Sequence, residues 1–208
     1  MQDSRRQYSQ DDSEFSRAYT KLKLFDKTVK FGHRLAGRVV IDVGSSTGGF
    51  TNFALEKGAK KVIAIEIGSR QMDARLLADH RVRLYEKTDI LNVVSELEND
   101  TLNKIVVHMP DVALMDVSFV GARNILLHLR ESILSKGSVV VLLFKPQFED
   151  KEIELLNGIV KNSKMRREII RSFELWLSKN KFMIEAKKDS ELAGSKGNVE
   201  RLYVLKIV

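Results

Sequence analysis

The amino-acid sequence predicts an α/β fold in which helices cover both faces of a mostly parallel sheet. Short runs rich in Val, Ile and Leu alternate with helical patterns from Val39 to Phe144. Several of these runs are apolar throughout, which is typical of parallel strands that are buried on both faces. Two more strand patterns follow near the C-terminus, separated by a short turn-rich segment. We therefore expect these two to pair as antiparallel neighbours beside the parallel strands.

The helices and strands can be assigned in order along the chain. Apolar residues recur at helical spacing from Glu14 to about Phe31, which predicts an amphipathic helix with one basic face that stops at Gly32. Further helices are expected at Gly49–Lys57, Arg70–Ala78, Ala122–Ile133 and about Lys164–Lys179. The strands are expected at Val39–Val43, Val62–Ile67, Val82–Tyr85, Val112–Met115, Val139–Phe144, Phe182–Ala186 and Arg201–Ile207.

Length and composition suit one domain. The chain has 208 residues, of which 43% are hydrophobic and 30% are charged, as is ordinary for a globular protein. Residues 14–208 are expected to form this domain, preceded by a mobile polar and basic arm at residues 1–13. Because the chain has no cysteine and its four histidines are scattered, we expect neither a disulfide nor a metal site.

No segment has the character of a membrane helix or a secretion signal. The longest strongly apolar run, Val139–Phe144, is far shorter than the roughly 20 residues that cross a bilayer. The N-terminal residues are polar and lack the apolar stretch of a signal peptide. We expect a soluble, cytoplasmic protein.

The chain is basic, with a net charge of +7. Such a charge attracts polyanions over long range and favours nucleic acid as a partner. A well-solvated surface with an excess of lysine explains the charge equally well. The candidate nucleic-acid contacts are Arg5, Arg6, Arg17, Lys23, Lys164, Arg166 and Arg167.

A glycine-bearing loop follows the first expected strand, where ligands bind in open α/β sheets. Its spacing is D-x-G-x-x-x-G-G, which differs from the G-x-G-x-x-G of dinucleotide enzymes. A dinucleotide pyrophosphate needs a helix N-terminus to balance its charge, whereas a cationic sulfonium with an amino-acid tail favours a nearby carboxylate such as Asp42. The loop therefore favours S-adenosylmethionine. Its candidate cofactor contacts are Asp42, Gly44, Ser45, Ser46, Thr47, Gly48, Gly49 and Phe50.

Acidic residues at the next strand ends extend this predicted cofactor site. Glu66, followed by Ile67, lies twenty-four residues after Asp42 and could accept both ribose hydroxyls of a bound adenosine. Asp89 follows the third strand and could meet the adenine amino group. Asp116, after the fourth strand, completes the set of candidate cofactor contacts. The alternatives are a helix cap for Asp42 and a solvated strand end for Glu66.

Two lysines and two carboxylates are expected at the same edge of the sheet. Asp116 ends the fourth strand, Lys145 follows the fifth, Glu200 begins the last, and Lys21 lies on the first helix. A lysine that leaves the sheet core into a partly dry cleft is pushed towards its neutral form by desolvation. Such a group could accept the proton of a hydroxyl. A structural ion-pair network is the alternative interpretation.

These residues carry a resemblance to a known family. The chain resembles the FtsJ-type ribose 2′-O-methyltransferases, and more closely their TlyA-like subgroup, whose members are sometimes labelled hemolysins. The matching stretches are SRAYTKL (16–22), DVGSSTGGFT (42–51), MDVSF (115–119), KPQFE (145–149), NGIVKNS (157–163) and GNVERL (197–202).

The resemblance implies a fold, a reaction and a site. The fold would be the Rossmann-like fold of S-adenosylmethionine-dependent methyltransferases, and the substrate structured RNA, with ribosomal RNA expected first. The family's Lys-Asp-Lys-Glu tetrad maps residue by residue onto Lys21, Asp116, Lys145 and Glu200. Lys145 would then act as the base, or as a cation that steadies the alkoxide. Phe119 and Phe148 could stack on substrate bases, although cleft lining is the simpler interpretation.

The sequence departs from the subgroup in two places. Members usually carry an N-terminal S4-type RNA-binding domain, whereas here a short basic arm precedes Ser16, so we expect a protein without that domain. The segment EDKEIELLNG after Phe148 is also acidic and lacks the expected glycines. An RNA- or ribosome-binding protein of the same fold, with weak or lost catalysis, is the second hypothesis. A membrane-active hemolysin has no support, because no segment could span a bilayer.

Overall fold

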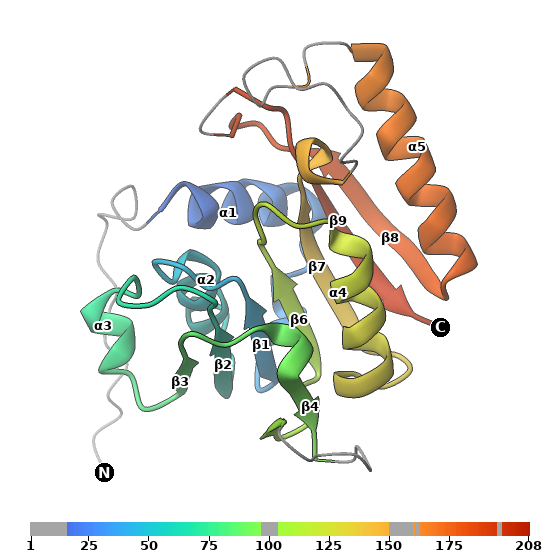
Figure 1. The fold of residues 1–208 in the computed structure, drawn as a ribbon. Coiled ribbons are helices and arrows are strands. Elements are labelled where there is room, and N and C mark those ends of the chain that lie inside the picture. Colours follow the sequence, from blue (N-terminus) through green and yellow to red (C-terminus); the bar gives the residue numbers. More distant parts are fainter. Residues whose placement is uncertain (1–15, 97–103, 150–159, 161–162, 195–196) are drawn as a thin grey trace.

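The computed structural model describes residues 16–96, 104–149, 160, 163–194 and 197–208. Seven of the described strands form one sheet in the order β3-β2-β1-β6-β7-β9-β8 (Figure 1). All neighbours are parallel except β9, which runs antiparallel to both β7 and β8. The predicted mostly parallel sheet with an antiparallel C-terminal strand is confirmed. The strands are β1 (Val39–Val43), β2 (Lys61–Ile65), β3 (Val82–Tyr85), β6 (Val112–Met115), β7 (Val139–Phe144), β8 (Phe182–Asp189) and β9 (Arg201–Ile207).

Helices cover the sheet on both faces, as expected, and each face has its own apolar core (Figure 1). Leu22 and Phe25 of α1 pack with Phe53 of α2 on one face. Leu126 of α4 and Phe173 of α5 are buried on the other. The helices are α1 (Arg17–Val29), α2 (Gly49–Glu56), α3 (Ala74–Leu77), α4 (Ala122–His128), which continues as the π-helical η4 (Leu129–Ile133), and α5 (Ser163–Lys179).

Some predicted boundaries are wrong. The helix expected at Arg70–Ala78 covers only Ala74–Leu77, because the side chain of Asp73 caps it by accepting a hydrogen bond from the Arg75 amide at 2.8 Å. Strand β2 ends at Ile65, whereas β8 runs on to Asp189. Several short elements were not predicted: a parallel pair, β4 (Val93–Ser95) and β5 (Ile105–Val107), and the 3₁₀ turns η2 (Gly32–Leu35), η3 (Ile90–Asn92) and η5 (Pro146–Phe148).

Other predictions lie outside the described residues. The N-terminal arm at 1–13, including Arg5 and Arg6, is one of them, and most of the NGIVKNS stretch is another. Among the residues that the structure does describe, no helix is long and apolar enough to cross a membrane. The same residues contain no cluster of three side chains suited to hold a metal ion.

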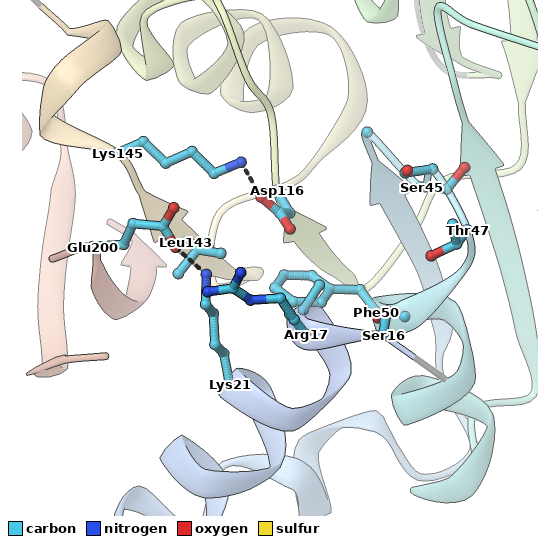
Figure 2. A pocket seen from close by; sticks show the side chains of 14 residues that line it. Ser16, Arg17, Lys21, Ser45, Thr47, Phe50, Asp116, Leu143, Lys145 and Glu200 are labelled. Atoms are coloured by element: carbon cyan, nitrogen blue, oxygen red, sulfur yellow. Dashed lines mark hydrogen bonds and ion pairs between the residues drawn. The ribbon is translucent and has the colours of Figure 1, made fainter. Parts of the chain in front are cut away.

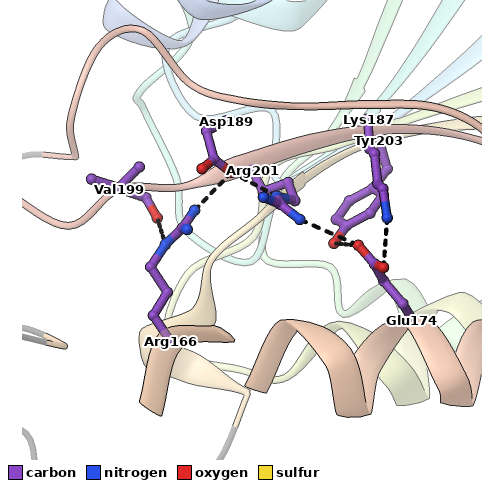
Figure 3. Close-up of polar contacts among 7 residues, drawn as sticks. All are labelled: Arg166, Glu174, Lys187, Asp189, Val199, Arg201 and Tyr203. Carbon is purple, nitrogen blue, oxygen red and sulfur yellow. Dashed lines mark hydrogen bonds and ion pairs between the residues drawn. The ribbon is translucent and has the colours of Figure 1, made fainter. Parts of the chain in front are cut away.

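A polar network fastens α5 to the β8–β9 pair (Figure 3). Glu174 of α5 lies at its centre and accepts hydrogen bonds from Tyr203 at 3.0 Å, Lys187 at 2.6 Å and Arg201 at 3.3 Å. Tyr203 belongs to β9 and is fully buried, so its hydroxyl depends on this partner inside the protein. The network therefore sets how the last strands sit against the helix layer.

Replacing Glu174 with alanine should lower the free energy of unfolding by about 1–3 kcal/mol, because it leaves the buried Tyr203 hydroxyl without its acceptor. Urea unfolding followed by circular dichroism measures the change. Glu168→Ala is the matched control, since Glu168 is an exposed carboxylate on the same helix and should stay within about 0.5 kcal/mol of the wild type. Equal unfolding midpoints for the two variants would contradict the assignment.

Candidate active site

A cavity of about 300 Å³ opens at the carboxyl edge of the sheet, which is the expected ligand position in this architecture (Figure 2). Five stretches far apart in the sequence form its wall: the start of α1, the loop after β1, and the ends of β6, β7 and the β8–β9 connection. Its volume falls at the lower end of the range for small-molecule sites. The lining residues are Ser16, Arg17, Ala18, Lys21, Gly44, Ser45, Ser46, Thr47, Gly49, Phe50, Asp116, Leu143, Lys145 and Glu200.

The glycines of the loop after β1 allow three segments to approach closely. Gly44 has φ +79°, and a Cβ there would lie 2.6 Å from the carbonyl oxygen of Asp116. Gly49 opens α2, and a Cβ there would lie 2.0 Å from Oγ of Ser16, which caps α1. The D-x-G-x-x-x-G-G spacing thus lets the loop pack against both β6 and α1. Gly48, with φ +95°, completes the turn between them.

Asp42 lies beneath this loop and does not line the cavity wall. It is fully buried, and its Oδ2 accepts a hydrogen bond from the Thr51 hydroxyl at 2.6 Å. Burial raises the pKa of Asp42 to about 7; the Thr51 hydrogen bond opposes the rise, and the charges of Asp116 and Glu66 add to it. Among the described residues, neither Asp42 Oδ1 nor Ser45 Oγ has a hydrogen-bond partner. Buried polar atoms without partners are expected where a ligand supplies them.

The Glu66 carboxylate accepts two backbone hydrogen bonds that the sequence did not predict. One carboxylate oxygen accepts the Ser46 amide at 2.8 Å, and the other accepts the Gly68 amide at 2.6 Å. The side chain therefore ties the end of β2 to the loop after β1. Ile67 is 74% exposed, and exposed Asp89 caps η3 through the Leu91 amide at 3.0 Å. Glu66, Ile67 and Asp89 lie outside the cavity lining, and their contacts with adenosine stay predictions.

The four residues of the predicted tetrad meet as two ion pairs at the cavity (Figure 2). Lys145 Nζ lies 2.6 Å from Asp116 Oδ1, at the ends of two neighbouring parallel strands. Lys21 Nζ lies 2.5 Å from Glu200 Oε2 and joins α1 to the start of β9. The side chains of the second pair are only 7% and 5% exposed, so each charge depends on its partner.

The backbone around Glu200 is held from both sides. The Ser190 amide donates to the Glu200 carbonyl at 2.9 Å. Arg166 of α5 donates to the Val199 carbonyl at 3.0 Å and to Asp189 at 2.8 Å (Figure 3). Burial acts to raise the pKa of Asp189, but hydrogen bonds from Arg201 and Arg166 outweigh it and leave the pKa lowered. Arg166, predicted as an RNA contact, thus uses its guanidinium to hold the backbone beside Glu200.

The other predicted nucleic-acid contacts are dispersed over the described surface. Arg17 lines the cavity and donates a hydrogen bond to the Ala193 carbonyl, which links α1 to the β8–β9 connection. Lys23 donates to the Tyr19 hydroxyl at 3.0 Å. Lys164 and Arg167 are exposed near the start of α5. Their contact with RNA stays a prediction.

Sequence reasoning missed a contact of one of the tetrad residues. The Lys145 amine donates a hydrogen bond to Ser118 Oγ at 2.6 Å, in addition to its pairing with Asp116. The signal in the sequence was the serine two positions after Asp116 in MDVSF. The next residue, Phe119, is 84% exposed and has φ +67°, and its ring centroid lies 5.1 Å from that of Phe148.

Comparison with known proteins places the chain in a family. The sequence profile of the FtsJ-like methyltransferases matches residues 15–207. The 23S rRNA (cytidine-2′-O)-methyltransferase TlyA of Campylobacter jejuni is 32% identical over 190 residues, which cover 90% of this chain and 69% of that protein. YqxC of Bacillus subtilis is 34% identical over 185 residues, and the match covers 88% of this chain. The chain spans 63% of the length of YqxC.

A solved structure shows the same likeness in three dimensions. The crystal structure of a protein from Lactococcus lactis, which bears the name hemolysin, has a TM-score of 0.81 and 32% sequence identity. The match covers 93% of this chain and 88% of that one. Sequence profile, relatives and fold agree, and the chain belongs to the FtsJ-like methyltransferase family.

Proposed function

We propose that this protein is an S-adenosylmethionine-dependent methyltransferase that methylates a ribose 2′-hydroxyl of structured RNA, with ribosomal RNA as the first candidate. The observation that carries the proposal is the Lys145–Asp116 pair, which faces the glycine-bearing loop across one cavity. The name of the C. jejuni relative, a 23S rRNA (cytidine-2′-O)-methyltransferase, supports the choice of substrate. A ribosomal RNA substrate would place the protein in the cytoplasm. Residues 14–208 would form one catalytic domain.

The residues at the cavity fit the proposed cofactor. When bound, S-adenosylmethionine supplies an electrophilic methyl group on a positively charged sulfur. The loop from Gly44 to Gly49 would let the cofactor come close to the backbone. Within the described part of the chain Ser45 Oγ has no hydrogen-bond partner, so a ligand could supply one. Each Glu66 oxygen accepts one amide and retains a lone pair for a ribose hydroxyl. Asp42 would contribute negative charge from beneath the loop.

The tetrad would prepare the hydroxyl for attack. A ribose 2′-hydroxyl is a poor nucleophile at neutral pH, so its proton must be accepted as the new C–O bond forms. We assign this proton to the Lys145 amine, which Asp116 orients at 2.6 Å. Lys21 and Glu200 would hold the hydroxyl in line, because their buried pair lies on the same cavity wall. Phe119 would offer an exposed ring on which a base could stack.

Lys145→Ala should lower the rate of methyl transfer by at least about 10²-fold, since it removes the proton acceptor. Transfer of labelled methyl to ribosomal RNA or ribosomal subunits measures the rate, and calorimetry with S-adenosylmethionine should find its affinity nearly unchanged. The control is Lys179→Ala, an exposed lysine on α5 that should leave the rate unaltered. Full turnover in Lys145→Ala would remove the proposed role. An inactive wild-type chain that still binds RNA would favour the second hypothesis, a binding protein of this fold.

The affinity for S-adenosylmethionine should rise as the pH passes about 7. Below that value Asp42 is protonated and neutral, because burial raises its pKa to about 7. A cationic ligand is attracted to the ionised form of Asp42, so the Asp42 proton must be released when the ligand binds. Binding therefore weakens as the pH falls. From pH 6 to pH 8 the ionised fraction, and with it the affinity, should rise about tenfold.

Calorimetry across this pH range measures the change, and Asp42→Asn should abolish the step. S-adenosylhomocysteine, which lacks the positive sulfur, is the matched ligand and should show a smaller step if Asp42 senses the sulfonium. The same pH dependence in wild type and Asp42→Asn would show that another group is responsible.

A further inference from the structure

The Lys145 amine has two protein partners, not one. Its nitrogen lies 2.6 Å from Asp116 Oδ1 in an ion pair and donates a hydrogen bond to Ser118 Oγ at 2.6 Å. An amine nitrogen has four tetrahedral directions, and the lysine's own Cε takes one of them. The hydrogen bond to Ser118 takes a second, and the ion pair with Asp116 draws the amine to one side, so the direction left for a substrate hydroxyl is restricted. With Asp116 alone, the amine could turn about its last side-chain bonds and leave that direction undefined.

The two partners differ in charge, and this difference matters for a proton acceptor. Asp116 brings a carboxylate to the amine. Ser118 is neutral and accepts a hydrogen bond from either form of the amine. In the neutral form, one N–H group can serve the Ser118 hydroxyl, and the lone pair can face a substrate hydroxyl. The serine thus directs the amine without placing a further charge beside it.

The loop that carries Ser118 is fixed against the segment that carries Lys145. On the far side of the serine, Glu149 accepts the Ala122 amide at 2.9 Å and pairs with Arg123 at 2.7 Å. The rings of Phe119 and Phe148 lie in contact between these points. Phe119 also has φ +67°, a conformation that costs a non-glycine residue energy and persists where its surroundings impose it. These contacts between the loop after β6 and the segment after β7 therefore fix the position of the serine relative to the amine.

We propose that Ser118 is a positioning residue for the methyl-transfer reaction, which fixes the direction in which the Lys145 amine meets the ribose 2′-hydroxyl. This role rests on the proposed function. It predicts a loss in the rate of the chemical step rather than in the binding of either substrate.

The test compares Ser118→Ala with Ser118→Thr. The alanine variant should lower kcat by about 10- to 100-fold, as expected for a misdirected catalytic group. Its KM values for S-adenosylmethionine and RNA should stay within about twofold of the wild type. The threonine variant keeps the hydroxyl and should recover most of the rate. Ser178→Ala on α5 is the matched control, since Ser178 is exposed and lies outside the site.

An unchanged kcat in Ser118→Ala would overturn the proposal. So would a raised KM for RNA with kcat intact, which would make Ser118 a binding contact. Equal losses in the alanine and threonine variants would also overturn it, since they would point to loop packing and not to the hydroxyl.

A second measurement does not depend on turnover. Acetic anhydride modifies accessible neutral amines, and mass spectrometry of peptides reports the rate at Lys145. Ser118→Ala should raise this rate severalfold, because one of the two restraints on the amine is lost, whereas Ser118→Thr should not. An unchanged rate in the alanine variant would overturn the contact itself. A changed rate in a protein that transfers no methyl group would keep the contact and remove the proposed function.

Discussion

The candidate site depends on pairing opposite charges that the fold brings to one edge of the sheet. The Lys21–Glu200 pair is almost fully buried and joins a helix near the start of the described chain to its last strand. Removing one partner of such a pair costs about 3–5 kcal/mol, because the other charge is left buried and alone. Topology makes the pairing possible: β9 lies beside β7, so the start of β9 faces the end of β7 that carries Lys145.

Much of the fold could be predicted from the sequence, because the central strands of the sheet are buried. The bounds expected for β1, β6 and β7 agree with the structure, since their continuous apolar runs end where polar loop residues begin. Ile67 was wrongly assigned to a strand because hydrophobicity does not report exposure, and this side chain is 74% exposed. The strands β4 and β5, each of three residues, are too short for a periodic pattern to predict them.

The site was predictable in outline and not in detail. Order along the chain, together with the family resemblance, identified the two lysines and two carboxylates that line the cavity. Side-chain hydrogen bonds depend on loop conformation and rotamers, which a sequence pattern does not carry. For this reason the burial of Asp42 beneath its loop, the two amides held by Glu66 and the hydroxyl of Ser118 became visible only in the structure.

The place of β9 in the sheet bears on how the protein is made. This strand lies between β7 and β8, with Tyr203 and Leu205 fully buried, yet it follows both of them in the chain. During synthesis β8 therefore has no neighbour in the sheet until residues 201–207 leave the ribosome, and Glu200 arrives with them. Contacts of such long sequence separation form late. A growing chain of this protein would thus have no complete charge quartet until its last strand joins the sheet.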